Sequence, residues 1–209
     1  MAENQIKKSE GILSYNSPVI LTFTIIAVIV QLLSSIPVLD WTHRLFVTGP
    51  GSFLDPLYYL RLFTHVIGHG SWAHLVGNFT FILLVGPMLE EKYGGKRLLF
   101  MMSVTAVATA LINNLFFSNG LCGASGIVFM FILLASCTTS KKNDNRIPIT
   151  LILAAVFYLG QEVINTLKPD NVSQLAHIIG GIIGAGFGLY FAKTGNSKEK
   201  SLPPASETE

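Results

Sequence analysis

The stretch Gly123-Ala124-Ser125-Gly126 stands where a short polar loop gives way to an apolar run. A serine between glycines at the start of a membrane helix can serve close helix packing, or it can be a nucleophile. Taken alone, the pattern favours packing. The rest of the sequence therefore has to decide the role of Ser125.

The composition of the chain is that of a membrane protein. Half of the 209 residues are hydrophobic and only 12% are charged, whereas a soluble domain carries about a quarter charged residues. The apolar residues form blocks instead of following a helical or strand period, which indicates lipid as the solvent. The net charge of +2 is small and scattered, so it does not indicate nucleic acid binding. Cys122 and Cys137 fit neither a disulfide framework nor a zinc site.

Six apolar runs are candidates for membrane helices, each of which needs roughly 20 apolar residues. We predict them at 18–36, 74–89, 98–117, 123–139, 147–165 and 173–192. The segment between the first two runs is rich in aromatic residues, so we expect it to lie in the membrane interface. The sequence thus predicts an all-α membrane domain over residues 18–192. It is flanked by an N-terminal tail over 1–17 and a disordered C-terminal tail over 193–209.

The positive charges predict the orientation, because lysine and arginine accumulate in cytoplasmic loops. If the N-terminus is cytoplasmic, eleven of the 14 lysine and arginine residues fall on that side. The other three are Arg44, Arg61 and Lys168. We therefore expect both termini in the cytoplasm, and the small soluble tails favour a prokaryotic plasma membrane.

Ser125 and a histidine are predicted at the same depth. Ser125 lies 16 residues before Lys141, and His177 lies 16 residues before Lys193. At about 1.5 Å per helical residue, both sit about 24 Å above the cytoplasmic boundary. Because the hydrocarbon core is about 30 Å thick, this level lies just below the outer surface.

Two further polar residues bracket that level. His74 and Asn78 lie 18 and 14 residues before Lys92, which corresponds to about 27 and 21 Å. Their spacing of four puts them on one helix face. Polar groups inside a membrane are costly, so four of them at one level predict a functional site.

Small residues offer a way to bring Ser125 and His177 together. Glycines repeat every four residues along the face of His177, at Gly180, Gly184 and Gly188. Such a stripe lets two helix backbones approach closely. Gly123 and Gly126 offer the same on the helix of Ser125.

A serine–histidine pair at this level would be suited to nucleophilic attack. A serine hydroxyl is a weak nucleophile until a base takes its proton, and a neutral histidine such as His177 can take it. The developing oxyanion needs hydrogen-bond donors, for which Asn78, His74 and the backbone N–H of Ser125 are candidates. No aspartate or glutamate lies at this level within a run, which predicts a dyad and not a triad.

In these residues the chain resembles the rhomboid family of intramembrane serine proteases. The similar segments follow the family's order: Arg61-Leu62-Phe63-Thr64-His65 with His69, His74-Leu75-Val76-Gly77-Asn78, Gly123-Ala124-Ser125-Gly126, and Ala176-His177-Ile178-Ile179-Gly180 with Gly184. The resemblance covers roughly residues 61–188 and implies a six-helix bundle with a membrane-embedded first loop. It implies cleavage of single transmembrane helices near their outer end, without a cofactor.

The resemblance also implies roles for individual residues. Ser125 would be the nucleophile and His177 the base. The oxyanion and substrate-binding residues would be His74, Asn78 and Gly123. Residues with packing or structural roles would be Gly126, Gly180, Gly184, Arg61, His65, His69 and Phe129.

Three positions depart from the family pattern. Leu60 stands where a tryptophan is frequent, Gly77 where a bulky gate residue can occur, and Phe129 where a tyrosine commonly stacks on the base. A phenylalanine ring can still stack, although the hydroxyl is lost. We expect these differences to affect gating and substrate preference, not the dyad.

Other functions are weighed against an active protease whose partners are transmembrane helices and the bilayer. A rhomboid-like pseudoprotease would bind such helices for trafficking or degradation, but these proteins lack the serine or the histidine. A transporter would carry charges near the middle of the membrane, where these runs have none. A metal site from His65, His69 and His74 would require that stretch to be helical. We expect no metal there, and we expect His65 and His69 to hydrogen-bond the loop.

Overall fold

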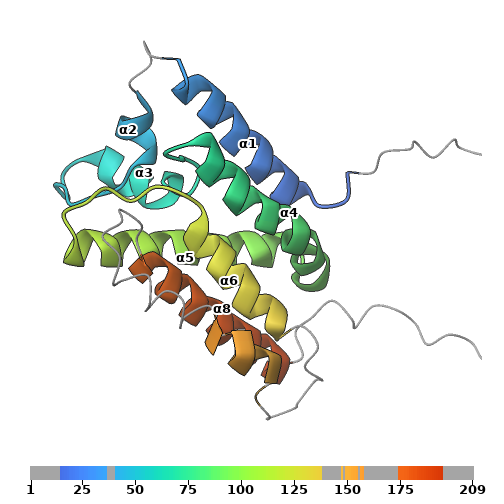
Figure 1. The fold of residues 1–209 in the computed structure, drawn as a ribbon. Helices are drawn as coiled ribbons and strands as arrows, with labels where there is room; N and C mark the ends of the chain where they lie inside the picture. The colour runs from blue at the N-terminus through green and yellow to red at the C-terminus, as the bar shows by residue number, and fades with distance from the viewer. Residues whose placement is uncertain are drawn as a thin grey trace, which may run out of the picture.

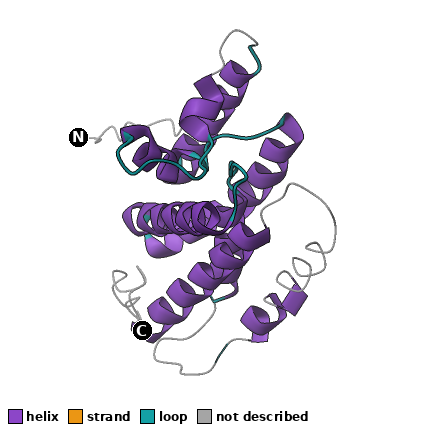
Figure 2. Cartoon of the chain, turned by 90° about the vertical axis from the view of Figure 1, so that its left-hand side faces the viewer, coloured by secondary structure: helices purple, strands orange, loops and turns teal. Residues whose placement is uncertain are grey.

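The computed structural model describes residues 15–36, 41–137, 147, 149–154, 156–157 and 174–194. These residues form a bundle of helices joined by loops, which confirms the predicted all-α class (Figures 1 and 2). The named helices are α1 (Pro18–Ser34), α2 (Trp41–Phe46), α3 (Pro56–Thr64), α4 (Trp72–Tyr93), α5 (Gly95–Phe116), α6 (Ser125–Ser136) and α8 (Gln174–Thr194). Residues 149–154 and 156–157 are also helical.

Three of these helices are long and apolar enough to cross a membrane. They are α4 and α5, of 22 residues each, and α8, of 21 residues. The apolar helices α1 and α6 are shorter, with 17 and 12 residues. A count of six spans is therefore not established. Most of the fifth predicted run, the two tails and Lys141 lie outside the described residues.

The segment between α1 and α4 contains two short helices and exposed apolar side chains. Pro56 begins α3, and the Asp55 carboxylate caps it by accepting a hydrogen bond from the Leu57 N–H at 2.9 Å. Arg61 forms an ion pair with Asp55 at 2.6 Å. Leu54 is 93% exposed, and such apolar exposure beside polar caps fits a position in the membrane interface.

The core of the bundle lies around α4, which contacts α1, α5 and α6. Its members are mainly aliphatic side chains and methionines, such as Ile82, Leu89 and Met101. Large apolar residues on the outward faces, such as Leu84, stay exposed. Apolar surface on both sides of a helix is expected where lipid surrounds the bundle.

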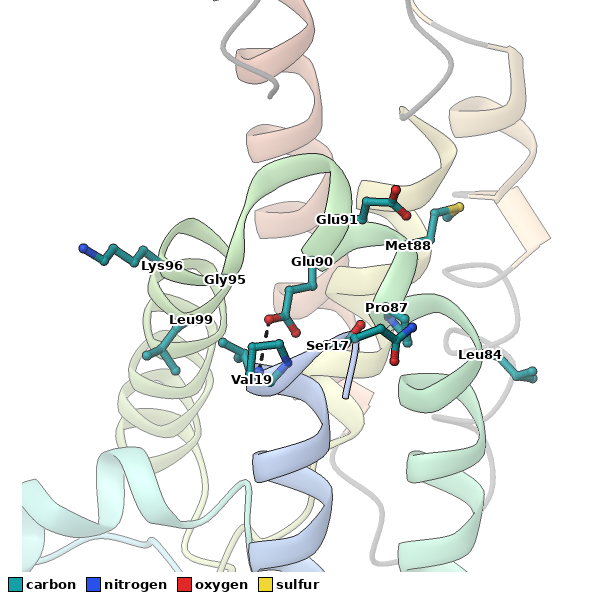
Figure 3. Close-up of a pocket in the computed structure, with 12 residues that line it drawn as sticks. Ser17, Val19, Leu84, Pro87, Met88, Glu90, Glu91, Gly95, Lys96 and Leu99 are labelled. Atoms are coloured by element: carbon teal, nitrogen blue, oxygen red, sulfur yellow. Dashed lines mark hydrogen bonds between the residues drawn. The ribbon is translucent and has the colours of Figure 1, made fainter. Parts of the chain in front are cut away.

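A buried carboxylate joins α4 to the start of α1. Glu90 accepts a hydrogen bond from the backbone N–H of Val19 at 3.1 Å (Figure 3). It accepts a second from the backbone N–H of Ile20 at 3.0 Å, so it satisfies two of the orphan donors at a helix start. A pocket of about 1020 Å³ opens beside this cap. Glu90 lies 12 residues after Asn78, about 18 Å along the helix, so this pocket lies at the other end of α4 from the predicted site.

Candidate functional site

Helices α6 and α8 are in direct backbone contact. A Cβ atom added to Gly180 would lie 2.0 Å from the carbonyl oxygen of Gly126, and one added to Gly184 would lie 2.2 Å from that of Met130. No larger side chain fits at such distances, so the helices can approach this closely only because glycine stands at these positions. Figure 1 shows the two helices running side by side. Ser125 directly precedes Gly126, and His177 lies three residues, about one helical turn, before Gly180.

A stacked pair of rings fixes His177 against α6. Ser125 is the first residue of α6, and Phe129 follows it by four residues, hence on the same helix face. The rings of Phe129 and His177 stack with centroids 4.4 Å apart and an angle of 8° between their planes. His177 is only 7% exposed, whereas Ser125 is half-buried. The imidazole therefore covers the face of α6 that begins at Ser125.

The loop before Ser125 is pressed against the first turns of α4. Gly123 has a φ of +120°, which strongly favours glycine. A Cβ atom there would lie 2.6 Å from Cε1 and 2.8 Å from Nε2 of His74, and 3.7 Å from Nδ2 of Asn78. Both the conformation and the contact require glycine. They bring the His74 ring and the Asn78 amide to the backbone that leads to Ser125.

His69 joins this loop to Asn78. Its Nε2 accepts hydrogen bonds from the Ala124 backbone N–H at 3.3 Å and from the Asn78 amide at 3.1 Å. Since Nε2 accepts, the ring proton is assigned to Nδ1, which donates to the Ile67 carbonyl at 3.1 Å. Burial, with a smaller contribution from the charge of His74, lowers the pKa of His69 to about 4. His69 is thus a neutral acceptor at physiological pH.

His65 anchors the same loop through its main chain. Its carbonyl accepts a hydrogen bond from the Gly123 N–H at 2.9 Å. The ring contacts the Arg61 carbonyl through Nδ1 at 3.2 Å, and burial lowers its pKa to about 4. Two further bonds, between the backbones of Thr48 and Leu121, close the upstream side of the loop. The chain before Ser125 is therefore held at several points.

The other predicted positions are Arg61, Leu60 and Gly77. Arg61 and Asp55 form a partly exposed ion pair, which contributes little to stability. Leu60 is 44% exposed. A Cβ atom on Gly77 would meet nothing within 4 Å, so a larger side chain would project into open space. Among the described residues, no three His, Cys, Asp or Glu side chains are grouped as metal ligands would be.

One connection was missed by reasoning from the sequence. His69 was expected to hydrogen-bond its own loop, as it does with Ile67, but it also binds Asn78 and Ala124. Ala124 is 55 residues away along the chain. No spacing in one sequence indicates a contact between a ring nitrogen and a backbone N–H so far apart.

Comparison with known proteins places this geometry in context. The model of the family described as Rhomboid domain matches residues 56–194. The chain is 26% identical over 138 residues to the rhomboid protease GlpG of Haemophilus influenzae, covering 64% of this chain and 70% of that protein. It is 24% identical over 175 residues to rhomboid-like protein 15 of Arabidopsis thaliana, covering 75% of this chain and 43% of that protein. Over 143 residues it is 23% identical to GlpG of Enterobacter sp., covering 68% of this chain and 51% of that protein. The match thus spans about half of two of these three relatives.

Proposed function

The chain belongs to the rhomboid family, and from this premise we propose that it is an intramembrane serine endopeptidase. Its substrates would be membrane proteins, cleaved within or beside a transmembrane helix. Ser125 would be the nucleophile and His177 the general base. This chemistry needs neither a metal nor a cofactor.

The observation that carries this proposal is the stacking of Phe129 on His177. Phe129 lies on the face of α6 that begins at Ser125, and the rings are 4.4 Å apart. An aromatic partner at this distance restricts the tilt and position of an imidazole. A base held in this way, beside a serine at a helix start, is the arrangement that proton abstraction needs.

The proposed reaction follows from the side chains around Ser125. Its hydroxyl attacks the scissile carbonyl carbon while His177 takes the hydroxyl proton. His177 then gives that proton to the leaving amine, and water attacks the acyl-enzyme in the second half of the reaction. Because α6 begins at Ser125, the positive end of its helix dipole would lie near the developing charge.

Asn78 and His74 would donate to the oxyanion. The Asn78 amide has two N–H groups, and one of them is directed at Nε2 of His69. The Nε2 atom also accepts from Ala124, so the Asn78 atom facing it is nitrogen and the second N–H is left for substrate. His74 lies against Gly123, where an added Cβ atom would be 2.8 Å from the His74 Nε2. Donors fixed beforehand cost no reorganisation during the reaction.

The orientation predicted from the positive charges would put this end of the bundle at the outer surface of a prokaryotic plasma membrane. Both termini would be cytoplasmic, and residues 18–192 would form the membrane domain with six spans. Substrate helices would enter from the bilayer. The open position at Gly77 and the exposed Leu60 would influence which helices are accepted.

The test uses the full-length protein in liposomes with a model substrate that has one transmembrane helix. Wild type should cleave it, while Ser125→Ala and His177→Ala should not. Labelling by a fluorophosphonate should likewise require both residues. Cleavage that survives Ser125→Ala would refute the proposal. A folded wild type that binds the helix, but neither cleaves it nor reacts with the fluorophosphonate, would indicate a pseudoprotease.

A further inference from the structure

A second, smaller cavity lies behind the loop that leads to Ser125. Its volume is about 170 Å³, and it is enclosed by the end of α1, the loop over residues 68–70 and the residue before Gly123. Its lining runs from the exposed Gly70 to the buried Gln31 and His69, and it includes Cys122. The cavity is distinct from the one beside Glu90, with which it shares no lining residue.

Gln31 supplies an unsatisfied acceptor to this cavity. The residue is 6% exposed, and its Oε1 is buried without a hydrogen-bond partner. The nearby Ser34 hydroxyl donates instead to the Val30 carbonyl at 2.6 Å. A buried acceptor without a donor is costly, so we expect the cavity contents to provide one. A volume of about 170 Å³ is well above what one water molecule requires.

Cys122 connects the contents of the cavity to the catalytic loop. It lies between two anchored residues, Leu121, which pairs with Thr48, and Gly123, which donates to His65. Its side chain is half-buried and lines the same cavity as Gln31. Burial raises the pKa of the Cys122 thiol, so the protonated form dominates at neutral pH. A group attached to this sulfur would occupy the cavity directly behind Gly123.

We propose that this cavity is a hydrated binding site for small, uncharged polar molecules and that Cys122 is a covalent modification site within it. A thiol-reactive molecule that enters the cavity would displace water from Gln31 and shift the backbone at Gly123. Inhibition of the enzyme through this shift rests on the proposed function. The adduct itself does not.

Methyl methanethiosulfonate is a suitable probe because it is small and uncharged. The Cys122 thiolate attacks the methyl-bearing sulfur of the reagent, and the thiol proton passes to water. A sulfur–sulfur bond forms between the protein and the methylthio group, and methanesulfinate leaves with the electron pair of the broken bond. The cysteine sulfur is oxidised, and the sulfinate is the reduced product. A thiol reductant reverses the step.

Cys137 provides the matched control. It is 1% exposed, and it packs against Gly188, where an added Cβ atom would lie 2.6 Å from its sulfur. The full-length protein in liposomes is treated with the reagent as wild type, Cys122→Ala and Cys137→Ala. Mass spectrometry should find one adduct, at Cys122, in wild type and Cys137→Ala. Fluorophosphonate labelling of Ser125 should fall at least several-fold in these two proteins, recover with dithiothreitol, and stay unchanged in Cys122→Ala.

A variant of Gln31 tests the hydration. Gln31→Met keeps the approximate shape of the side chain but removes the Oε1 acceptor, to which water would donate a hydrogen bond. A drier cavity favours the neutral thiol, so adduct formation at Cys122 should slow by about three- to ten-fold. An equal rate in Gln31→Met would refute the hydrated site.

No adduct at Cys122 before the protein is denatured would refute the modification site. An adduct that leaves Ser125 labelling unchanged would refute the proposed shift of the backbone at Gly123. Untreated wild type that neither cleaves substrate nor labels at Ser125 would instead refute the proposed function. The adduct and its dependence on Gln31 would still test the cavity.

Discussion

Two helix pairs in this bundle are joined in different ways. Helices α6 and α8 touch backbone to backbone, since an added Cβ atom on Gly180 would lie 2.0 Å from Gly126. Helices α1 and α4 meet through side chains, among them Glu90, whose carboxylate accepts two N–H groups from the start of α1. The α6–α8 contact requires that glycine, which has no side chain beyond hydrogen, stands at the crossing. The α1–α4 contact requires the carboxylate side chain of Glu90.

This difference matches the proposed role of each pair. To act as the proposed base, His177 must lie within hydrogen-bonding reach of Ser125, and a contact without side chains permits that approach. The Glu90 cap lies at the other end of α4 from the proposed site and has only to secure the start of α1 against the bundle. Side-chain packing can adjust to a small change, whereas two backbones in contact cannot.

The largest effect should come from Gly180→Ala. The added methyl group would collide with the Gly126 carbonyl oxygen, and neither backbone can move aside without separating the helices. The loss of folding free energy should exceed the roughly 1–3 kcal/mol that overpacking usually costs. Proteolysis should be lost as well. Thermal unfolding in detergent micelles and substrate cleavage measure the two effects.

Gly186→Ala is the matched control on the same helix, because an added Cβ atom there meets nothing within 4 Å. It should be neutral or stabilise by up to about 1 kcal/mol, since alanine favours helix more than glycine. If the two alanine variants unfold at the same temperature, the backbone contact is not what holds α8.

Acid should weaken the attachment of α6 through the histidines behind it. The pKa of His65 is lowered to about 4 in the fold by burial, while it is near 6.5 when unfolded. The unfolded chain therefore takes up a proton first. The contribution of the neutral His65 ring to the free energy of unfolding is fully present above about pH 6.5. It falls by about 3 kcal/mol as the pH drops to about 4. The pKa of His69 is lowered in the same direction.

The measurement is the unfolding midpoint between pH 7.5 and 4. Glu90→Gln removes the carboxylate of the other contact, so the loss of stability should persist in that variant. His65→Gln should show a clearly smaller loss. A midpoint that becomes independent of pH in Glu90→Gln would assign the acid sensitivity to α1 and α4 instead.

A smaller effect should follow from Glu90→Ala. Two backbone N–H groups at the start of α1 would lose their acceptor, which should cost about 2 kcal/mol. The proposed active site lies at the other end of α4, so the protein that remains folded should keep its rate of fluorophosphonate labelling. Glu91→Ala, beside it but exposed, should change stability by less than about 0.5 kcal/mol. Equal losses in the two variants would show that the cap contributes nothing.

The close approach of α6 and α8 is the part of the fold that could be predicted from the sequence. Its glycines at positions 180, 184 and 188 repeat at helical spacing, and counting residues put Ser125 and His177 at one depth. Both signals are local, because each can be read within a single helix. Counting nevertheless gives only a level. The stacking of Phe129 on His177 depends on how the two helices are turned. It was expected only from the family resemblance, and the structure shows it.

The role of Glu90 could not be predicted in the same way. The second apolar run was predicted over residues 74–89, but α4 continues to Tyr93 and Glu90 is buried. Its hydrogen-bond partners are 70 and 71 residues away. From the sequence alone, a carboxylate at a membrane boundary is an exposed one. His69 shows the same limit, because its bond to Ala124 crosses between two loops.

The smallest and most specific effect should come from Phe129→Leu. It removes the ring that stacks on His177 but leaves the glycines of α6 and α8 in place. Such ring pairs contribute about 1 kcal/mol, so kcat/KM and the rate of Ser125 labelling should fall about five-fold, with little change in the unfolding temperature. Phe129→Tyr should keep the stacking and most of the rate. If Phe129→Leu labels as fast as wild type, the backbone contact alone positions the base, and the aromatic ring serves only to fill space beside it.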